Sequence, residues 1–541
     1  MFLNGAEGNQ RCGNPENLEG WERTASIGRL LAQRVMEHSE SIVCAEAPLT
    51  VGHTAMDLPA TIASSFLPPS TVLSTLEING LLMTFYPGEP CVEMGLRMRE
   101  EALRRGYASQ FTVGLGNDHL LYFVPWEYYP KRYYETAMNF YGPFIEDVFC
   151  REFSKLMTKG SPIAPLPVPA EPDVQQLPGG CIVRLEGSAH ERGYQRGLAF
   201  RGEIVHAYQG RIVAGCDSGS LIPATGLWQS APNFINLTPL ALPVLAIGAR
   251  PMLASLPEDQ LRELNGVALA TGLSFDAVWM AQCARIITRH EPRTELYRAP
   301  FCTMFAVVEE RAGADEVLVG RNFDWTGSDM PIAAVHHCAD GQRWFQVGFG
   351  WSTGTFTAMN DKGLVLCAER VEALGNPSID GPPIEMVLRR ILETESVSVL
   401  AAKQLETAGN LEGYHVLIAD PETLRARVIE LGSSAETRWP SSGFLLGSDP
   451  ENEHIGEAAK ARYTRVLELL GEERIVSIGE IQEALADRAS ADGGPDCIFN
   501  TNTQYSVVFE PKALKVHIAF TTPEGKPGEY TTISLAPENE S

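Results

Sequence analysis

One cysteine in this chain stands where a thiol could act as a nucleophile. Cys302 precedes a run of strand-forming residues at 303–308, and a second run at 317–319 leads into Arg321 and Asp324. A Gly-Ala-Asp turn separates the runs, so the pattern predicts a β-hairpin with the thiol at the start of one strand and a basic and an acidic side chain at the end of the other. A nearby cation favours a thiolate, and a thiolate attacks carbonyl carbons. The expected chemistry is therefore acyl transfer through a thioester.

The same segments, 302–303 (Cys-Thr) and 320–325 (Gly-Arg-Asn-Phe-Asp-Trp), resemble a family of N-terminal-nucleophile (Ntn) hydrolases. These are the autoproteolytic cysteine acyltransferases and hydrolases of the isopenicillin-N acyltransferase type, to which bile salt hydrolases are related. The resemblance implies that cleavage between Phe301 and Cys302 frees the α-amino group of Cys302 as a general base, with a pKa of about 7.7–8.0. It also implies that Arg321 and Asp324 position the cysteine. A buried core cysteine beside a strand-end ion pair is the structural alternative.

Two later positions bear on the same family pattern. Arg462, at the start of a predicted helix, matches an arginine that reaches back to the family's active site, although a solvated helix arginine would look the same. Ser448 follows a predicted strand at 443–446, where the family usually has an asparagine that stabilises the oxyanion. A hydroxyl donates one hydrogen bond and reaches less far than a carboxamide. The loss of one such donor costs about 10²–10³ in rate, so either backbone N–H groups assist or the chain is a catalytically weak binding or scaffold protein that retains the fold.

An upstream segment, 71–148, resembles the end of the catalytic domain of neutral (non-lysosomal) ceramidases. The resemblance implies zinc-binding roles for Glu89, in a Pro-Gly-Glu motif, and for Tyr122, or for His119 where the match departs. A zinc site needs three or four ligands in fixed geometry, and the family's two zinc-binding histidines have no clear counterpart here. We therefore expect a remnant or accessory domain, with no metal or organic cofactor required. A zinc-dependent N-acyl amidase run by this segment is the less favoured alternative.

A proline-rich stretch marks the clearest domain boundary. Residues 161–178 hold six prolines and predict a stiff, extended linker. It separates a smaller mixed α/β domain (1–160) from an Ntn-hydrolase domain (179–541). The resemblance divides the latter into a precursor part, 179–301, and a nucleophile part, 302–541.

Hydrophobic patterns predict the fold of the larger domain. Strands are expected at 343–349, 356–359, 364–367, 415–419, 427–431, 505–509 and 516–520, with helices around 384–392 and 463–470. Strands, helices and strands in this order suit an α+β fold, a four-layer αββα sandwich. A helix is also expected near 190–197, where Gly193 and Gly197 indicate close packing against another element.

Composition limits the partners. The 541 residues carry a net charge of −25, which argues against nucleic acid and anionic membranes. No run of about 18 apolar residues or secretory signal is visible, and the eleven scattered cysteines are typical of reduced thiols in a cytoplasmic protein. We therefore expect a cytoplasmic enzyme acting on a small-molecule N-acyl amide. A homo-oligomer is compatible with the sequence, which specifies neither the acyl group nor the acceptor.

Overall fold

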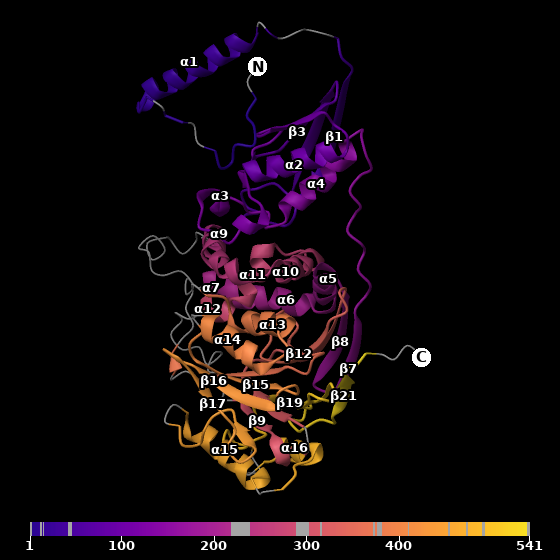
Figure 1. Ribbon diagram of the computed structural model, residues 1–541, viewed down its shortest axis with the longest axis vertical. Helices are drawn as coiled ribbons and strands as arrows, with labels where there is room; N and C mark the ends of the chain where they lie inside the picture. The colour runs from indigo at the N-terminus through magenta and orange to yellow at the C-terminus, as the bar shows by residue number, and fades with distance from the viewer. Residues whose placement is uncertain are drawn as a thin grey trace. The chain divides into compact units, whose positions relative to one another are not determined.

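The chain divides into two compact units, Met1–Leu166 and Pro167–Ser541 (Figure 1). The computed structural model describes the whole chain except residues 1–2, 11–12, 15, 40, 42–45, 218–237, 288–301, 314–315, 372–373, 376–380, 409–410, 453–454, 472–473, 489–492 and 538–541. Phe301, the predicted residue before the scissile bond, therefore lies outside the described residues. The division between the units falls inside the predicted linker 161–178.

Unit 1 is built on a four-stranded sheet with the order β1-β2-β3-β5. Its strands are β1 (Leu49–Asp57), β2 (Ser70–Ile78), β3 (Leu81–Phe85) and β5 (Ser109–Val113), and a separate pair is formed by β4 (Glu89–Pro90) and β6 (Tyr122–Phe123). Its helices are α1 (Gly20–Ser39), α2 (Val92–Arg104), α3 (Tyr134–Ala137) and α4 (Ile145–Leu156), with a 3₁₀ turn at Trp126–Tyr128. The β2–β3 turn has positive φ at Asn79 (46°) and Gly80 (86°), as a tight hairpin turn requires.

Unit 2 contains two larger sheets. The six-stranded sheet has the order β18 (Phe444–Leu446), β9 (Thr303–Val307), β10 (Leu318–Asp324), β19 (Thr503–Glu510), β20 (Lys515–Phe520), β21 (Thr531–Ser534). The nine-stranded sheet has the order β17 (Ala435–Arg438), β16 (Arg425–Leu431), β15 (Tyr414–Asp420), β14 (Val365–Arg370), β13 (Thr357–Asn360), β12 (Arg343–Phe349), β11 (Pro331–Cys338), β8 (Gly180–Gly187), β7 (Asp173–Leu177). β7 occupies the end of the predicted linker, because residues 173–177 lack proline and can pair with β8.

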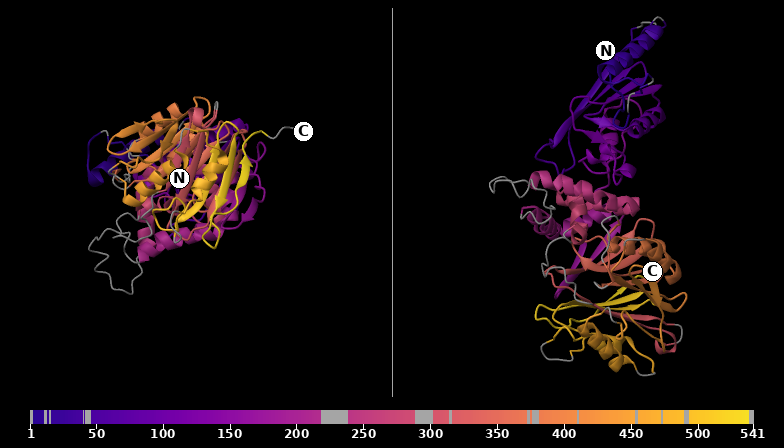
Figure 2. Two further views of the ribbon diagram at one scale, coloured as in Figure 1. Left: turned by 90° about the horizontal axis from the view of Figure 1, so that it is seen from below. Right: turned by 90° about the vertical axis from the view of Figure 1, so that its left-hand side faces the viewer.

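Helices cover the outer faces of these sheets (Figure 1 and Figure 2). α13 (Ile384–Thr394) and α14 (Ser398–Ala408) share a buried apolar cluster with the nine-stranded sheet. α15 (Glu457–Leu470) and α16 (Ile478–Leu485) share another with the six-stranded sheet. The remaining helices are α5 (Ala189–Ala199), α6 (Arg201–Tyr208), α7 (Ala214–Asp217), α9 (Thr238–Ala249), α10 (Glu258–Thr271), α11 (Phe275–Gln282) and α12 (Ala284–Ile287), with a π-helical turn at Gln209–Val213 and 3₁₀ turns at Arg250–Ser255 and Glu309–Arg311.

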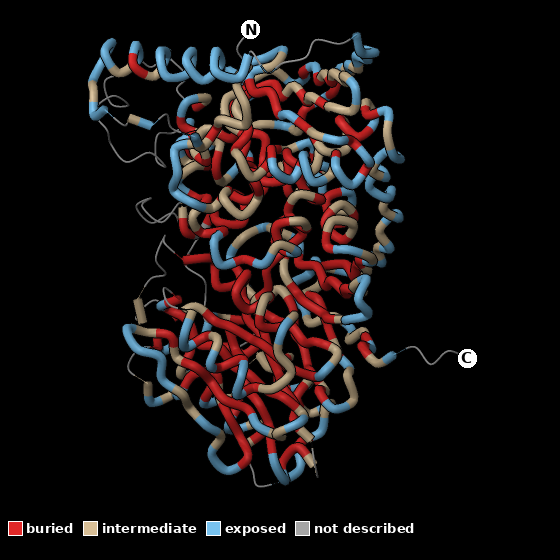
Figure 3. Tube along the Cα trace, turned by 45° about the horizontal axis from the view of Figure 1, so that its top comes forward, coloured by how far each residue is buried: buried red, intermediate tan, exposed pale blue. Residues whose placement is uncertain are grey.

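The inner faces of the two sheets contact each other. The Thr357 and Tyr505 hydroxyls are 2.8 Å apart, and the rings of Phe345 and Phe509 meet edge to face at 6.2 Å. Every residue of β10 is buried, and buried segments follow the strands of both sheets (Figure 3). The predicted nucleophile hairpin thus lies in the interior of unit 2.

One described helical stretch, Thr238–Ser255, is long and apolar enough by length and composition alone to cross a membrane, with a mean hydropathy of 1.2. Core helices pass the same test. In this stretch Arg250 forms a buried ion pair with Asp276 of α11 at 2.7 Å, which ties it to the packed helices of unit 2.

The predicted close packing of the glycine-spaced helix is confirmed. α5 crosses α10 so closely that a methyl group at Gly193 would collide with the carbonyl oxygen of Glu263, and one at Gly197 would lie 2.6 Å from the β-carbon of Ala270. Only hydrogen at these positions allows the two backbones to approach to this degree.

We expect Gly193→Ala to lower the free energy of unfolding of unit 2 by about 1–3 kcal/mol, because the added methyl group overpacks the crossing. Chemical denaturation followed by circular dichroism measures it. Gly202→Ala in α6 is the matched control, since a methyl group there meets no described atom within 4 Å. Equal stability of both variants would show that the crossing is looser than described.

Candidate active site

The β9–β10 hairpin brings the predicted nucleophile and its arginine together. The strands are antiparallel, with Arg321 opposite Met304 and Asn322 opposite Thr303. Cys302 immediately precedes β9 and is 5% exposed. Arg321 Nη2 donates to Cys302 Sγ at 3.5 Å. The predicted Cys–Arg contact therefore follows directly from the strand register.

Arg321 is fully buried and held by both sheets. Its Nη2 also donates to the carbonyl oxygen of Ala368 on β14 at 2.6 Å, while Nη1 lies 3.7 Å from the sulfur of Met304. The guanidinium packs over the ring of Phe323, 5.3 Å from its centroid. Burial alone would lower the pKa of Arg321, but the facing Cys302 raises it and the net direction is upward. The guanidinium stays charged.

The cysteine itself is not a ready thiolate in the uncut chain. Burial raises the pKa of the Cys302 thiol to about 11, because desolvation outweighs the lowering effect of the Arg321 charge. The Arg321 charge lowers the pKa of Cys302, as expected, but not by enough to produce a thiolate. A separate base is needed to remove the thiol proton.

Asp324 and Arg462 lie in the same neighbourhood. A β-bulge between Phe323 and Asp324 shifts the pairing of β10 with β19. The two carboxylate oxygens of Asp324 accept hydrogen bonds from Asn500 Nδ2 (2.7 Å) and Thr503 Oγ1 (2.8 Å). Burial raises the pKa of Asp324, and the charge of Arg462 partly offsets this. Arg462 is itself buried and donates to the carbonyl oxygen of Pro495.

Ser448 is fully buried and bonded to two groups that the sequence did not indicate. Its hydroxyl donates to Glu369 Oε1 at 2.8 Å and lies 2.7 Å from His415 Nδ1. Glu369 also accepts a hydrogen bond from the Tyr463 hydroxyl at 3.1 Å. Donation by Ser448 to an oxyanion would require its proton to leave Glu369, so that role stays a prediction.

The functional candidates missed by sequence reasoning are buried polar residues on strands. Glu369 is 1% exposed and His415 fully buried, although both stand in otherwise apolar runs, Leu-Cys-Ala-Glu and His-Val-Leu-Ile. A charged side chain inside a buried strand is costly without a partner. A polar residue within an apolar strand pattern is therefore the sequence feature that could have indicated Glu369 and His415.

An aromatic wall adjoins the hairpin. Phe323, two residues after Arg321 on the same strand, packs against its guanidinium. The Phe323 ring also lines a cavity of about 10 Å³, which is too small for a ligand in the uncut chain. The lining consists of Phe323, Trp325, Val347, Gly348, Phe349, Trp351, Ser352, Gly354 and Phe356.

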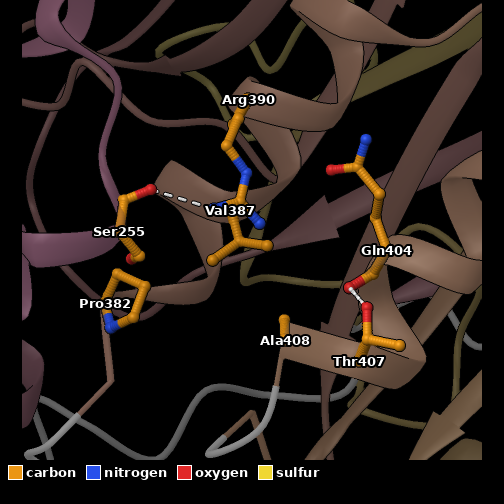
Figure 4. Close-up of a pocket in the computed structure, with 7 residues that line it drawn as sticks. All are labelled: Ser255, Pro382, Val387, Arg390, Gln404, Thr407 and Ala408. Atoms are coloured by element: carbon orange, nitrogen blue, oxygen red, sulfur yellow. Dashed lines mark hydrogen bonds between the residues drawn. The ribbon is translucent and has the colours of Figure 1, made fainter.

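A larger pocket of about 280 Å³ lies elsewhere, along α13 and α14 (Figure 4). It is lined by Ser255, Pro382, Val387, Arg390, Gln404, Thr407 and Ala408. Arg390 Nη1 donates to the carbonyl oxygen of Ser255 across this pocket at 2.9 Å. None of the predicted site residues lines it.

The weak metal candidates of unit 1 do meet. Glu89 and Tyr122 are opposite each other in the β4–β6 pair, and His119 Nε2 lies 3.8 Å from Glu89 Oε1. Burial, followed by the hydrogen bond to Glu89, raises the pKa of Tyr122 to about 12. These three side chains could supply metal ligands, but no group of three or more His, Cys, Asp or Glu with metal-site geometry occurs in the described part of the chain. A zinc role stays a prediction.

No known protein-family model matches the chain, and neither does any curated protein. Among solved structures, an N-acylethanolamine-hydrolyzing acid amidase ortholog from Caenorhabditis elegans is similar at 15% identity, over 38% of this chain and 92% of that one, with a TM-score of 0.30. A mutant of the conjugated bile acid hydrolase of Clostridium perfringens is similar at 15% identity, over 44% and 93%, with a TM-score of 0.32.

The neutral ceramidase of Pseudomonas aeruginosa is also similar, at 17% identity over 34% of this chain and 43% of that one, with a TM-score of 0.23. The structural neighbours thus include an acid amidase, a bile acid hydrolase and a ceramidase. Scores this low carry no argument about the fold or the reaction of this chain.

We expect alkylation of Cys302 by iodoacetamide in the uncut chain to rise up to about pH 11, because burial keeps the thiol protonated below that value. Arg321→Gln removes the charge that lowers this pKa and should slow alkylation further at pH 9. Peptide mapping of the adduct gives the alkylation rate, on protein that intact-mass spectrometry shows to be uncut. An alkylation rate that already levels off near pH 7 would contradict the protonated thiol.

Proposed function

We propose that the chain is an Ntn-type cysteine amidase or acyltransferase that cleaves a non-peptide N-acyl bond through an acyl-thioester. The observation that supports it most is the buried Cys302 at the start of β9, bonded to Arg321 but held protonated. Such a thiol needs a base within reach. Cleavage before Cys302 would supply one on the same residue, its own α-amino group, with a pKa of about 7.7–8.0. We assign the facing sheets and their outer helices to the four-layer αββα sandwich of this class.

The proposed reaction uses the described residues in sequence. The α-amino group takes the thiol proton, the sulfur attacks the amide carbon, and the resulting ammonium returns a proton to the leaving amine. Arg321 and Asp324, fixed by Ala368, Asn500 and Thr503, hold the nucleophile in place. Water or a second amine then attacks the thioester and releases the acyl group.

Maturation would begin on the uncut chain. The Cys302 thiol attacks the carbonyl carbon of Phe301, its proton passes to the Cys302 nitrogen as the C–N bond breaks, and a thioester forms. Water hydrolyses this thioester and separates residues 1–301 from 302–541. In the described structure β8, from the first piece, pairs in parallel with β11 of the second, from Cys181–Ile332 to Gly187–Cys338. The buried ion pair between Glu263 and Arg389, at 2.5 Å, also joins the two pieces.

A catalytically weak binding protein is the second candidate. The aromatic cavity beside the hairpin is closed in the uncut chain, and the Ser448 proton is engaged by Glu369. A zinc-dependent amidase run by unit 1 is a third candidate, and metal analysis of the purified protein tests it.

The nine cysteines of the described residues are all free thiols, which supports a reducing compartment such as the cytoplasm.

Cys302→Ala should abolish hydrolysis of any N-acyl amide that the wild type cleaves, while the fold is retained, since a thiol at a strand start contributes little packing. Turnover on an acyl-amide panel with mass readout measures this. Cys181→Ala, at another buried cysteine, is the matched control and should remain active. Undiminished turnover by Cys302→Ala would refute the proposed function.

Freshly purified active protein should consist of two pieces, residues 1–301 and 302–541. Because β7 and β8 belong to the nine-stranded sheet, the pieces should co-elute under native conditions and separate only in denaturant. Native and denaturing mass spectrometry, with N-terminal sequencing of the smaller piece, measures this. An uncut chain that nonetheless cleaves amides would show that the α-amino base is dispensable.

A further inference from the structure

Three ionisable side chains form a row across the nine-stranded sheet, of which Glu369 and His415 are buried and Glu430 is partly exposed. Glu369 on β14 stands opposite His415 on β15, which in turn stands opposite Glu430 on β16. His415 Nδ1 lies 3.4 Å from Glu369 Oε1, and His415 Nε2 lies 3.8 Å from Glu430 Oε1. Burying the Glu369 carboxylate and the His415 imidazole in a sheet is expensive. Hydrogen bonds to its members offset this cost and make the row rigid.

The hydrogen bonds fix the direction in which the row is polarised. The Ser448 hydroxyl has a single proton, and it donates to the Glu369 carboxylate at 2.8 Å. With the hydroxyl proton used in that bond, His415 Nδ1, which lies 2.7 Å from Ser448 Oγ, is assigned as the donor of the second bond. His415 Nε2 has no hydrogen-bond partner among the described residues, so the bond to Ser448 is the one that orients the ring.

The far end of the row is anchored to the strand that leads into Ser448. Arg438 pairs with Glu430 and donates to the carbonyl oxygen of Leu446 at 3.1 Å. A methyl group at Gly447 would lie 2.7 Å from the Tyr463 hydroxyl, so only glycine lets the chain pass at this point. The Ser448 backbone is therefore fixed independently of its side chain.

The near end of the row reaches the nucleophile. The Tyr463 hydroxyl donates to Glu369 and accepts the backbone N–H of Met304 at 3.4 Å. The residue before Glu369, Ala368, holds Arg321 through its carbonyl oxygen. Any movement of Glu369 would thus be transmitted to the strand that follows Cys302 and to the arginine that contacts its sulfur.

We propose that His415 is a positioning residue for the Cys302 centre: it turns the Ser448 hydroxyl toward Glu369, and this fixed carboxylate holds the β14 backbone that anchors Arg321. The inference rests on the proposed amidase function and adds a role for His415, Ser448 and Glu369 in it. Ser448 is then a link between two side chains rather than a donor to the oxyanion. A displacement of the anchored groups by about 1 Å can lower the rate of attack by about 10²-fold.

Two substitutions at one position separate positioning from packing. The asparagine side chain of His415→Asn is smaller than histidine but keeps an N–H donor near the Nδ1 position. The leucine side chain of His415→Leu preserves the volume and loses the donor. We expect His415→Leu to lower kcat by about tenfold or more with KM unchanged, because it loses one hydrogen bond to a charged network. The kcat of His415→Asn should stay within about threefold of the wild-type value. In a Ser448→Ala background the two variants should become equal.

A control variant and a second measurement distinguish a role of His415 from a general effect of changing a buried histidine. His336→Phe replaces another fully buried histidine of the same sheet, which stacks on Trp344 and whose ring nitrogens have no described partner; its activity should not change. The rate of Cys302 alkylation should differ from wild type in His415→Leu but not in His415→Asn. Because this rate needs no substrate, absence of wild-type amide turnover would refute the proposed function without deciding the role of His415.

Three outcomes would overturn the inference. The first is an active His415→Leu beside an inactive His415→Asn, which would show that the residue only fills space. The second is equal alkylation rates and equal turnover in both variants. The third is retained or raised activity in Ser448→Asn, because a carboxamide does not fit the fully buried link and would succeed only as an oxyanion donor.

Discussion

The proposed active site depends on one buried cation that bridges two sheets. Arg321 extends from β10 of the six-stranded sheet, contacts the Cys302 sulfur, and donates to the Ala368 carbonyl oxygen of the nine-stranded sheet. A guanidinium suits this task because it is planar, always charged and offers several donors in fixed directions. Its burial is tolerable only while those acceptors stay in place, so the packing of the sheets and the geometry at the sulfur are coupled.

The same burial restrains the cysteine in the described chain. Desolvation keeps the thiol protonated despite the adjacent cation. An α-amino group at Cys302 would change this balance by adding a base on the nucleophile's own residue. In this account the uncut chain is a folded but restrained precursor, and the first 301 residues remain as a structural component through β7 and β8.

Local patterns were enough to predict the hairpin but not the network behind it. The two strands that place Cys302, Arg321 and Asp324 have an alternation and a turn that can be recognised in the sequence, and the structure confirms that β9 and β10 pair antiparallel. The partners of Ser448 lie 79 and 33 residues earlier in the chain, on strands that meet it only after the two sheets pack. The order of the strands in a nine-stranded sheet is not encoded in local periodicity, so Glu369 and His415 could not be placed from spacing alone.

The most direct test of the account is to trap the acyl group on the protein. Mature protein mixed briefly with an N-acyl amide substrate and quenched in acid should show, by intact-mass spectrometry, the mass of the acyl group added to the piece that begins at Cys302. Peptide mapping should locate the added mass at that cysteine, and hydroxylamine should remove it. An acyl group found on residues 1–301, or turnover without any acylated intermediate under these conditions, would contradict the account.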